Sequence, residues 1–381
     1  MRRNETSRQA TIESLSRDVL RLSQLLTKER ASLPQAYLRD RGLREAYAAY
    51  YLPVNSTKIA LPLRELDRHP SGILRKDRLR VLDIGCGPGT SLLGVMTFFD
   101  EQPVRPALAF TAVDQVAENL RIAETFFQGH RGASAVSATL KTLHGNLETG
   151  IGAPEGPFDL VILSNVLSEL HAQQSERLRL RSGIVQGIME RLLDGNGSCI
   201  IIEPALRETG RELLQVRDTL QQCGFRVYSP CLRNGPCPAL EQPKDWCHED
   251  RNWEPPSTVR EIDSRIGLRK DSLKFSYLVV RRDGKILADC VEAGAWRVVS
   301  EPIVTKGKRE LFLCGNGGRV RTVRLDKDAD QGNAAFSGLA RGSIVRLEGA
   351  FPEPGRVKVV RGTIVEIDAN STAGETDRLV K

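Results

Sequence analysis

The stretch that decides the fold reads Val81-Leu82-Asp83-Ile84-Gly85-Cys86-Gly87-Pro88-Gly89-Thr90. Apolar residues lead into an acid, and three glycines then follow at every second position. This pattern predicts the end of a buried parallel strand, a tight turn and the first turn of a helix. Glycine suits the turn because a ligand can approach backbone that no Cβ obstructs, while the helix start offers it free N–H groups.

Two classes of cofactor use such a turn. A dinucleotide site expects Gly-x-Gly-x-x-Gly, but Thr90 stands where that pattern needs its third glycine. Asp83 lies two residues before Gly85, where a carboxylate can accept hydrogen bonds from a cationic amine. The series acid-x-Gly-x-Gly-x-Gly resembles the first motif of the Rossmann-like methyltransferases that use S-adenosylmethionine (SAM). The alternatives are a nicotinamide or flavin site and a structural turn without a ligand.

Composition and charge narrow the class of protein. The 381 residues are long enough for two or three domains, and no apolar run is long enough to cross a membrane. The N-terminus resembles neither a secretory signal nor a transit peptide, so we expect a cytoplasmic protein without a membrane partner. Of the net charge of +7, residues 1–80 carry +8 and residues 81–223 carry −6. Basic flanks around an acidic centre favour a polyanionic partner, although solvated helices would carry the same charges.

The chain divides by composition and pattern. Residues 78–223 alternate strand and helix, which predicts an α/β fold, a doubly wound and mostly parallel seven-stranded sheet covered on both faces. Short strands with turns after this region predict a small β module. The expected divisions are an N-terminal helical region (1–72), a methyltransferase domain (73–284) with a cysteine-rich insertion (230–273), the β module (285–370) and a loose tail (371–381).

Polar residues at strand ends complete the predicted SAM site, whose core is Asp83, Gly85, Gly87 and Gly89. Asp114 ends the second strand, where one carboxylate can accept from both ribose hydroxyls or cap the next helix. Asn146 follows the third strand and suits an adenine contact or a turn. Ser164 and Asn165 follow the fourth strand, near a transferred methyl.

The catalytic group is not assigned. The tetrad of Asp or Asn, two prolines and an aromatic, which amine methyltransferases of DNA and RNA place after the fourth strand, is absent here. His171 is a candidate base, but a histidine at a helix start is more often structural.

The second informative stretch is the insertion between strands 225–229 and 274–280, which would otherwise form a hairpin. It carries Cys231, Cys237 and Cys247 among prolines and glycines, with few apolar residues to bury, and this predicts a metal centre. No Cys-x-x-Cys pair is present, which weakens a zinc ribbon, whereas iron–sulfur clusters tolerate looser spacing. The candidates for a fourth ligand are Cys314, Cys290 and His248. Free surface cysteines are the alternative.

The cysteine segments resemble a known family. The run Cys231 to His248, the run Lys274 to Leu278 and the run Leu311 to Cys314 are similar to the mitochondrial small-ribosomal-subunit methyltransferase-like proteins and their bacterial relatives. The resemblance covers about residues 35–325. It implies a Rossmann-like methyltransferase domain, a four-iron four-sulfur (4Fe–4S) cluster and association with the ribosomal small subunit and its RNA. The implied cluster ligands are Cys231, Cys237, Cys247 and Cys314, with zinc as the alternative metal.

Three functions are compatible with these features. The first is a SAM-dependent methyltransferase that acts on ribosomal RNA or a ribosomal protein of the small subunit. The second is a non-catalytic assembly factor that keeps the SAM pocket, and the missing tetrad favours it. The third is a small-molecule methyltransferase, which the basic flanks disfavour. Arg319 and Arg321 share one strand face and are candidates for phosphate contacts.

Overall fold

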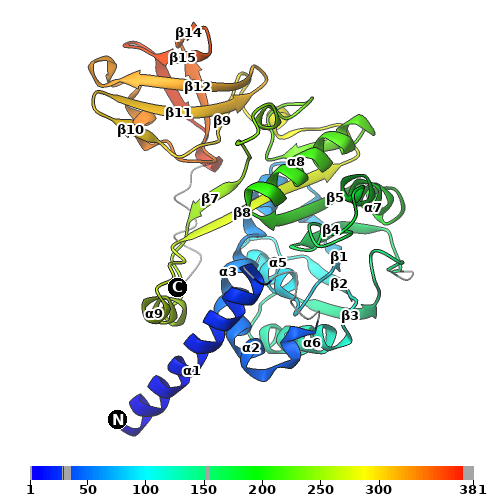
Figure 1. Cartoon of the computed structure of the whole chain (residues 1–381). Helices are drawn as coiled ribbons and strands as arrows, with labels where there is room; N and C mark the ends of the chain where they lie inside the picture. Colours follow the sequence, from blue (N-terminus) through cyan, green and yellow to red (C-terminus); the bar gives the residue numbers. More distant parts are fainter. Residues whose placement is uncertain (1, 28, 30–35, 152–153, 372–381) are drawn as a thin grey trace.

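The computed structural model describes residues 2–27, 29, 36–151 and 154–371 and contains a large mixed sheet and a smaller β module (Figure 1). The large sheet has the order β3-β2-β1-β4-β5-β8-β6, and β7 pairs with β8. The strands β1 to β5 pair in parallel, and β8 runs antiparallel to β5, β6 and β7. The strands are β1 (Arg78–Ile84), β2 (Ala107–Asp114), β3 (Ala138–His144), β4 (Phe158–Ser164), β5 (Leu193–Pro204), β6 (Arg226–Ser229), β7 (Glu249–Asn252) and β8 (Ser272–Arg281).

Helices cover both faces of this sheet, as the alternation of strand and helix predicts. Apolar side chains of β1 alternate between the faces, with Val81 on one side and Leu82 on the other. The first face packs against α5 and α6, and the second packs against α7 and α8. These helices are α5 (Thr90–Asp100), α6 (Ala117–Arg131), α7 (Arg177–Arg191) and α8 (Arg207–Gln222). The Rossmann-like fold predicted from residues 81–90 is therefore confirmed.

The insertion contains more regular structure than its prolines and glycines suggested. Strand β7 adds an eighth strand to the sheet, where the sequence predicted seven, and α9 (Ser257–Ile266) follows it. Helix α9 starts directly after Pro256, where a proline is tolerated, and ends at Gly267 with φ +69°. Its Val259 and Ile262 are buried in the main core. Apolar packing therefore stabilises this part of the insertion.

The N-terminal region is helical over the described residues and packs on the sheet near the carboxyl end of β1. Helix α1 lies against α2 and against α9 of the insertion (Figure 1). The elements are α1 (Arg2–Thr27), α2 (Arg41–Ala46), the π-helical turn η3 (Tyr47–Tyr51), α3 (Leu52–Thr57) and α4 (Ala60–Asp67). Residues 28 and 30–35, which the predicted helical region includes, and residues 372–381 of the predicted loose tail lie outside the described residues. The predicted domain boundaries stay predictions.

The β module forms a second sheet of order β14-β15-β12-β11-β9-β13-β16, with β10 paired to β11. Its strands are β9 (Trp296–Val298), β10 (Ile303–Thr305), β11 (Lys308–Gly315), β12 (Gly318–Leu325), β13 (Ile344–Glu348), β14 (Phe351–Glu353), β15 (Arg356–Val359) and β16 (Ile364–Ile367). The buried Arg297 joins the module to the rest of the chain. Its guanidinium pairs with Glu65 of α4 at 2.6 Å and with Glu249 of β7 at 2.8 Å.

The described part of the chain has no helix that combines the length and the apolar character needed to cross a membrane.

Candidate functional sites

The first site is the glycine turn between β1 and α5. Gly85, Gly87 and Gly89 all have positive φ, at +68°, +53° and +79°. Residues other than glycine rarely adopt such backbone angles. A Cβ on Gly85 would lie 2.5 Å from Cγ2 of Val166, so this glycine also serves packing. A Cβ on Gly87 would meet no atom within 4 Å. The open space for a ligand therefore lies at Gly87.

Asp83 stands beside this turn as a buried acid without a partner. Its side chain is 1% exposed, and neither carboxylate oxygen has a hydrogen bond. Burial, and then the charge of Asp114, raises the pKa of Asp83 to about 8. An unpaired buried carboxylate is costly, and a cation placed against it would remove that cost. The position therefore suits a cationic group of a ligand.

Asp114 holds the turn in shape from the end of β2. Its Oδ2 accepts from the backbone N–H of Gly87 at 2.9 Å, and its Oδ1 accepts from that of Val116 at 2.8 Å. Asn119 Nδ2 donates to the same Oδ1 at 3.2 Å. The structure thus brings Asp114 next to the glycine turn, as the sequence predicts. Its contact with ribose stays a prediction.

The two predicted asparagines occupy the neighbouring loops. Asn146 uses both ends of its amide within its own surroundings, because Oδ1 accepts from the Glu148 N–H and Nδ2 donates to Gln115 Oε1, each at 2.7 Å. Asn165 lies just after β4 with φ +57°, and its N–H donates to the Ile202 carbonyl at 2.7 Å. These contacts explain both residues as loop residues, and their SAM contacts stay predictions.

His171 shares its surroundings with an acid. Its backbone N–H donates to Glu148 Oε1 at 2.5 Å, and its Nδ1 lies 3.6 Å from the same oxygen. Its φ is +51°, so the residue belongs to a tight turn after β4. These contacts give His171 a structural role in this loop.

Tyrosines of the N-terminal region reach the glycine turn, which the sequence reasoning did not anticipate. The Tyr47 hydroxyl lies 3.0 Å from Thr90 Oγ1, at the first residue of α5. Burial raises the pKa of Tyr47, and the nearby charge of Asp83 raises it further. Tyr47 opens the π-helical turn η3, a distortion that is frequent at functional sites. The clustered tyrosines were the available signal, and the structure places one of them on the turn.

Glu203 is a second buried acid that the sequence reasoning passed over. It lies near the end of β5, is 1% exposed and accepts from the Ser168 N–H at 3.3 Å, while its Oε2 has no partner. Burial raises its pKa to about 7. An acid at the tip of the fifth strand, next to the loop after β4, was the signal that could have found it.

The second site is a cavity between the insertion and the β module. Four cysteines line it, three from the insertion and one from β11: Cys231, Cys237, Cys247 and Cys314. Burial, and then neighbouring Cys231, raises the pKa of Cys247 to about 11 and that of Cys314 to about 12. Thiols in such a place stay protonated unless a metal deprotonates them. We call this group the four-cysteine site.

The three candidates for a fourth ligand separate in space. Cys314 of β11 and His248 both line the cavity. Cys290 packs against the main hydrophobic core and is absent from the cavity lining. His248 stacks on Trp246, with ring centroids 5.2 Å apart, and burial lowers its pKa to about 4.

Arginines surround the four-cysteine site. Arg217 of α8 is completely buried, and its Nε donates to Cys231 Sγ at 3.3 Å. Sequence reasoning missed it, although its position among Leu213, Leu214 and Leu220 puts a charge on the apolar face of the helix. Arg297 lines the same cavity. Glu65 and Glu249 balance the charge of Arg297, whereas Arg217 is the guanidinium in hydrogen-bond contact with a cysteine sulfur.

Arg319 and Arg321, the candidates for phosphate contacts, both pair with carboxylates. Arg319 pairs with Asp245 and lies over the Phe312 ring, while Arg321 pairs with Glu310 at 2.7 Å. Both guanidinium groups therefore have carboxylate partners within the protein, and their contact with phosphate stays a prediction.

The cysteines as they stand do not form a preformed site for one ion. Over the described residues, no group of three or more His, Cys, Asp or Glu side chains could hold a metal ion. A zinc site needs four ligands within about 2.0–2.3 Å of one ion. Each cysteine of a four-iron cluster binds a different iron, so its thiolates stand farther apart. Both the zinc and the cluster interpretations of these cysteines therefore stay predictions.

The strand order, the glycine turn and the acids at the strand ends define a Rossmann-like methyltransferase fold. A family model described as mitochondrial small ribosomal subunit Rsm22 matches residues 44–341. The chain therefore belongs to the Rsm22 family.

Individual relatives are more distant. The chain is 25% identical over 178 residues to the carboxy-S-adenosyl-L-methionine synthase of Methylococcus capsulatus, a match that covers 46% of this chain and 66% of that relative. The plantazolicin methyltransferase BpumL in complex with SAH shares 10% identity at a TM-score of 0.35, covering 72% of this chain and 99% of the other. A putative methyltransferase from Methanococcus maripaludis gives 11% identity and a TM-score of 0.37, covering 66% and 93%.

Proposed function

We propose that this protein binds SAM and acts on the ribosomal small subunit as a methyltransferase-like factor that also carries an iron–sulfur cluster. Membership in the Rsm22 family supports the link to the small subunit. The single observation that carries the SAM proposal is the Asp83 carboxylate, buried and unpartnered beside the glycine turn. A ligand with a cationic amine would supply the partner that the folded chain leaves out.

Each residue around the turn would have a separate role in binding SAM. Asp83 would accept from the amine, and the open space at Gly87 would let the ligand approach the backbone. Asp114 would keep the turn in shape through its bond to the Gly87 N–H. When bound, SAM would supply an electrophilic methyl group, and the protein would contribute chiefly by aligning the acceptor with it.

Calorimetry with SAM and with its demethylated product tests this part of the proposal. We expect Asp83→Asn to abolish or strongly weaken binding of both, because the buried cation then lacks its carboxylate. Asp159→Asn is the matched control, because Asp159 is also buried in the same sheet but pairs with Lys76 and the Arg80 N–H. Binding that is undetectable in the wild type, or unaltered in Asp83→Asn, would contradict the proposal.

A non-catalytic assembly factor is the second candidate function. The loop after β4 reads Asn165-Val166-Leu167-Ser168 and lacks the proline tetrad. His171, the candidate base, is held by Glu148. A chain that binds SAM but leaves purified small subunits unmethylated by a radiolabelled methyl donor would establish this function instead of catalysis.

The proposed cluster would be held by Cys231, Cys237, Cys247 and Cys314. Its support is the cavity that the four cysteines share and the Arg217 guanidinium that contacts Cys231 Sγ, because a cluster on four thiolates carries negative charge. When bound, it would tie β11 of the β module to the insertion. Iron and sulfide analysis of anaerobically purified protein tests it, and stoichiometric zinc without sulfide would contradict it.

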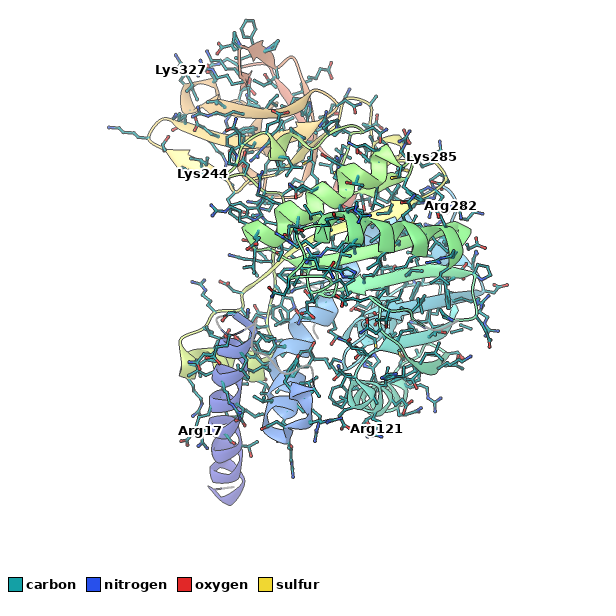
Figure 2. All side chains as sticks on the ribbon, turned by 45° about the vertical axis from the view of Figure 1, so that its right-hand side comes forward. Arg17, Arg121, Lys244, Arg282, Lys285 and Lys327 are labelled. Atoms are coloured by element: carbon teal, nitrogen blue, oxygen red, sulfur yellow. The ribbon has the colours of Figure 1, made fainter. Side chains whose placement is uncertain are left out.

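The proposed contact with ribosomal RNA rests on charge. Exposed basic side chains point outward from the N-terminal helix, α6, the insertion and the β module, including Arg17, Arg121, Lys244 and Lys327 (Figure 2). They are spread over the molecule, so an extended polyanion suits them better than a small anionic ligand. Crosslinking to cellular RNA would identify the contacted nucleotides, and affinity that does not fall with salt would rule out this electrostatic contact.

A further inference from the structure

Two neighbouring residues of α8 contact the first two cysteines of the four-cysteine site. Arg217 Nε donates to Cys231 Sγ at 3.3 Å. The carboxylate of Asp218 accepts from the Cys237 backbone N–H, with oxygen distances of 3.0 and 3.2 Å. Arg217 and Asp218 also pair with each other. One dipeptide on a rigid helix therefore holds both ends of the loop from Cys231 to Cys237.

The guanidinium of Arg217 also holds the middle of this loop. Its Nη1 donates to the Gly235 carbonyl at 2.9 Å, and its Nη2 donates to the Arg233 carbonyl at 3.4 Å. The planar fork of arginine makes these contacts and the contact with sulfur at the same time, which a lysine cannot do. Arg217 has no exposed surface, so its charge acts with little screening by water.

We propose that Arg217 and Asp218 are positioning residues of the four-cysteine site, where Arg217 donates a charged hydrogen bond to the Cys231 thiolate and Asp218 anchors Cys237 through its backbone. This inference rests on the proposed cluster. Partners outside the ligand shell orient metal ligands, and their loss commonly costs about 10–100-fold in metal affinity. The pair therefore affects both the affinity of the site for the cluster and the electrostatic potential at the bound cluster.

The two residues should shift the reduction potential in opposite directions. A four-iron cluster on four thiolates takes up one electron without breaking a bond, and its net charge then becomes more negative. The positive charge of Arg217 stabilises the reduced form, so Arg217→Gln should lower the potential. Asp218→Asn removes a negative charge from the same place and should raise it. A purely mechanical role would not produce opposite signs.

The test compares full-length variants purified without oxygen. Iron and sulfide per chain measure loading, and an electron paramagnetic resonance titration measures the one-electron midpoint potential. We expect weaker loading in both variants and midpoint shifts of opposite sign. Arg211→Gln is the matched control, because Arg211 also lies on α8 and donates to insertion carbonyls, including that of Asp245 at 2.6 Å, but contacts no cysteine sulfur. Its potential should match that of the wild type.

The outcomes separate the inference from the proposed function. A wild-type chain without iron and sulfide would overturn the cluster and this inference together. A loaded wild type whose loading and potential are unchanged in both variants would overturn this inference alone. If Arg217→Gln fails to fold, Arg217→Lys keeps the charge but loses the fork, so we expect weaker loading with a potential near that of the wild type. Unchanged loading in that variant would also overturn the inference.

Discussion

The glycine turn and the four-cysteine site are opposites in charge and in construction. The turn presents a buried carboxylate, Asp83, without a cation, whereas the four-cysteine site surrounds its thiols with buried guanidinium groups. The turn comes from one short run of sequence, and the four-cysteine site draws on the insertion and on β11. The first is suited to a cationic ligand, and the second to a cluster whose net charge is negative once four thiolates bind it.

The largest effect should come from removing the one cysteine that the β module contributes. We expect Cys314→Ser to lose iron and sulfide by more than about tenfold, since loss of a ligand should cost at least as much as loss of an outer partner. The matched control is Cys290→Ser, because Cys290 lies outside the cavity and should leave the metal content intact. If Cys290→Ser lost iron and sulfide and Cys314→Ser kept them, Cys290 would be the fourth ligand, and the proposed four-cysteine site would be wrong.

The next effect concerns the cationic ligand at the turn. Breaking a buried charge pair costs about 3–5 kcal/mol, so Asp83→Asn should weaken SAM binding by about 100-fold or more. Calorimetry measures it, with iron content as an internal control because the four-cysteine site should not respond. A variant that loses both SAM and iron would mean that the two sites are coupled.

The pH dependence of stability should sharpen the same contrast. Burial raises the pKa of Asp83 to about 8, against about 3.9 in an unfolded chain, so folding favours the protonated acid. The ligand-free protein should therefore lose stability as pH rises from about 4 to about 8, by a few kcal/mol at most. Thermal unfolding across this range should show a flatter profile for Asp83→Asn. Saturating SAM should flatten the wild-type profile, because a cation favours the ionised form.

The smallest effect should come from the tyrosine that reaches the turn. Tyr47→Phe removes the hydroxyl that lies 3.0 Å from Thr90 Oγ1 and should cost about 0.5–1.5 kcal/mol. Denaturant unfolding measures the loss. Tyr51→Phe is the comparison, since Tyr51 belongs to the same π-helical turn but its hydroxyl bonds Ser23 instead of Thr90. Equal losses in both would indicate that the contact with Thr90 has no special weight.

The sequence predicted the glycine turn well and the four-cysteine site only in part. The turn is local, so strand, glycines and helix follow one another within ten residues and need no distant partner. Asp114 could be placed beside it because neighbouring parallel strands end at the same edge of the sheet. By contrast, α9 and β7 were missed, since their proline-rich surroundings hid a helix that apolar packing stabilises.

Residues in contact across the fold escaped sequence reasoning for the same reason. The sequence favoured Cys314 over Cys290 and His248 as the fourth ligand, and the structure places Cys314 and His248 in the cavity lining but not Cys290. Strand alternation put Arg319 and Arg321 on one face but did not reveal their carboxylate partners, Asp245 and Glu310. The position of Arg217 on the apolar face of a helix indicated a buried charge, but the sequence did not show that its partner is Cys231.

By itself the sequence determined the Rossmann-like fold and the position of its ligand turn. The spacing of apolar residues and the placement of glycines are both set by residues close together in the chain. Only the tertiary structure decided that Asp83 has no partner, that Tyr47 reaches Thr90 and that Cys314 of the β module lines one cavity with the cysteines of the insertion and Arg217. Those facts depend on which side chains meet after the helices pack on the sheet and the β module joins it. Contacts between distant residues have no fixed spacing along the chain, so no local pattern encodes them.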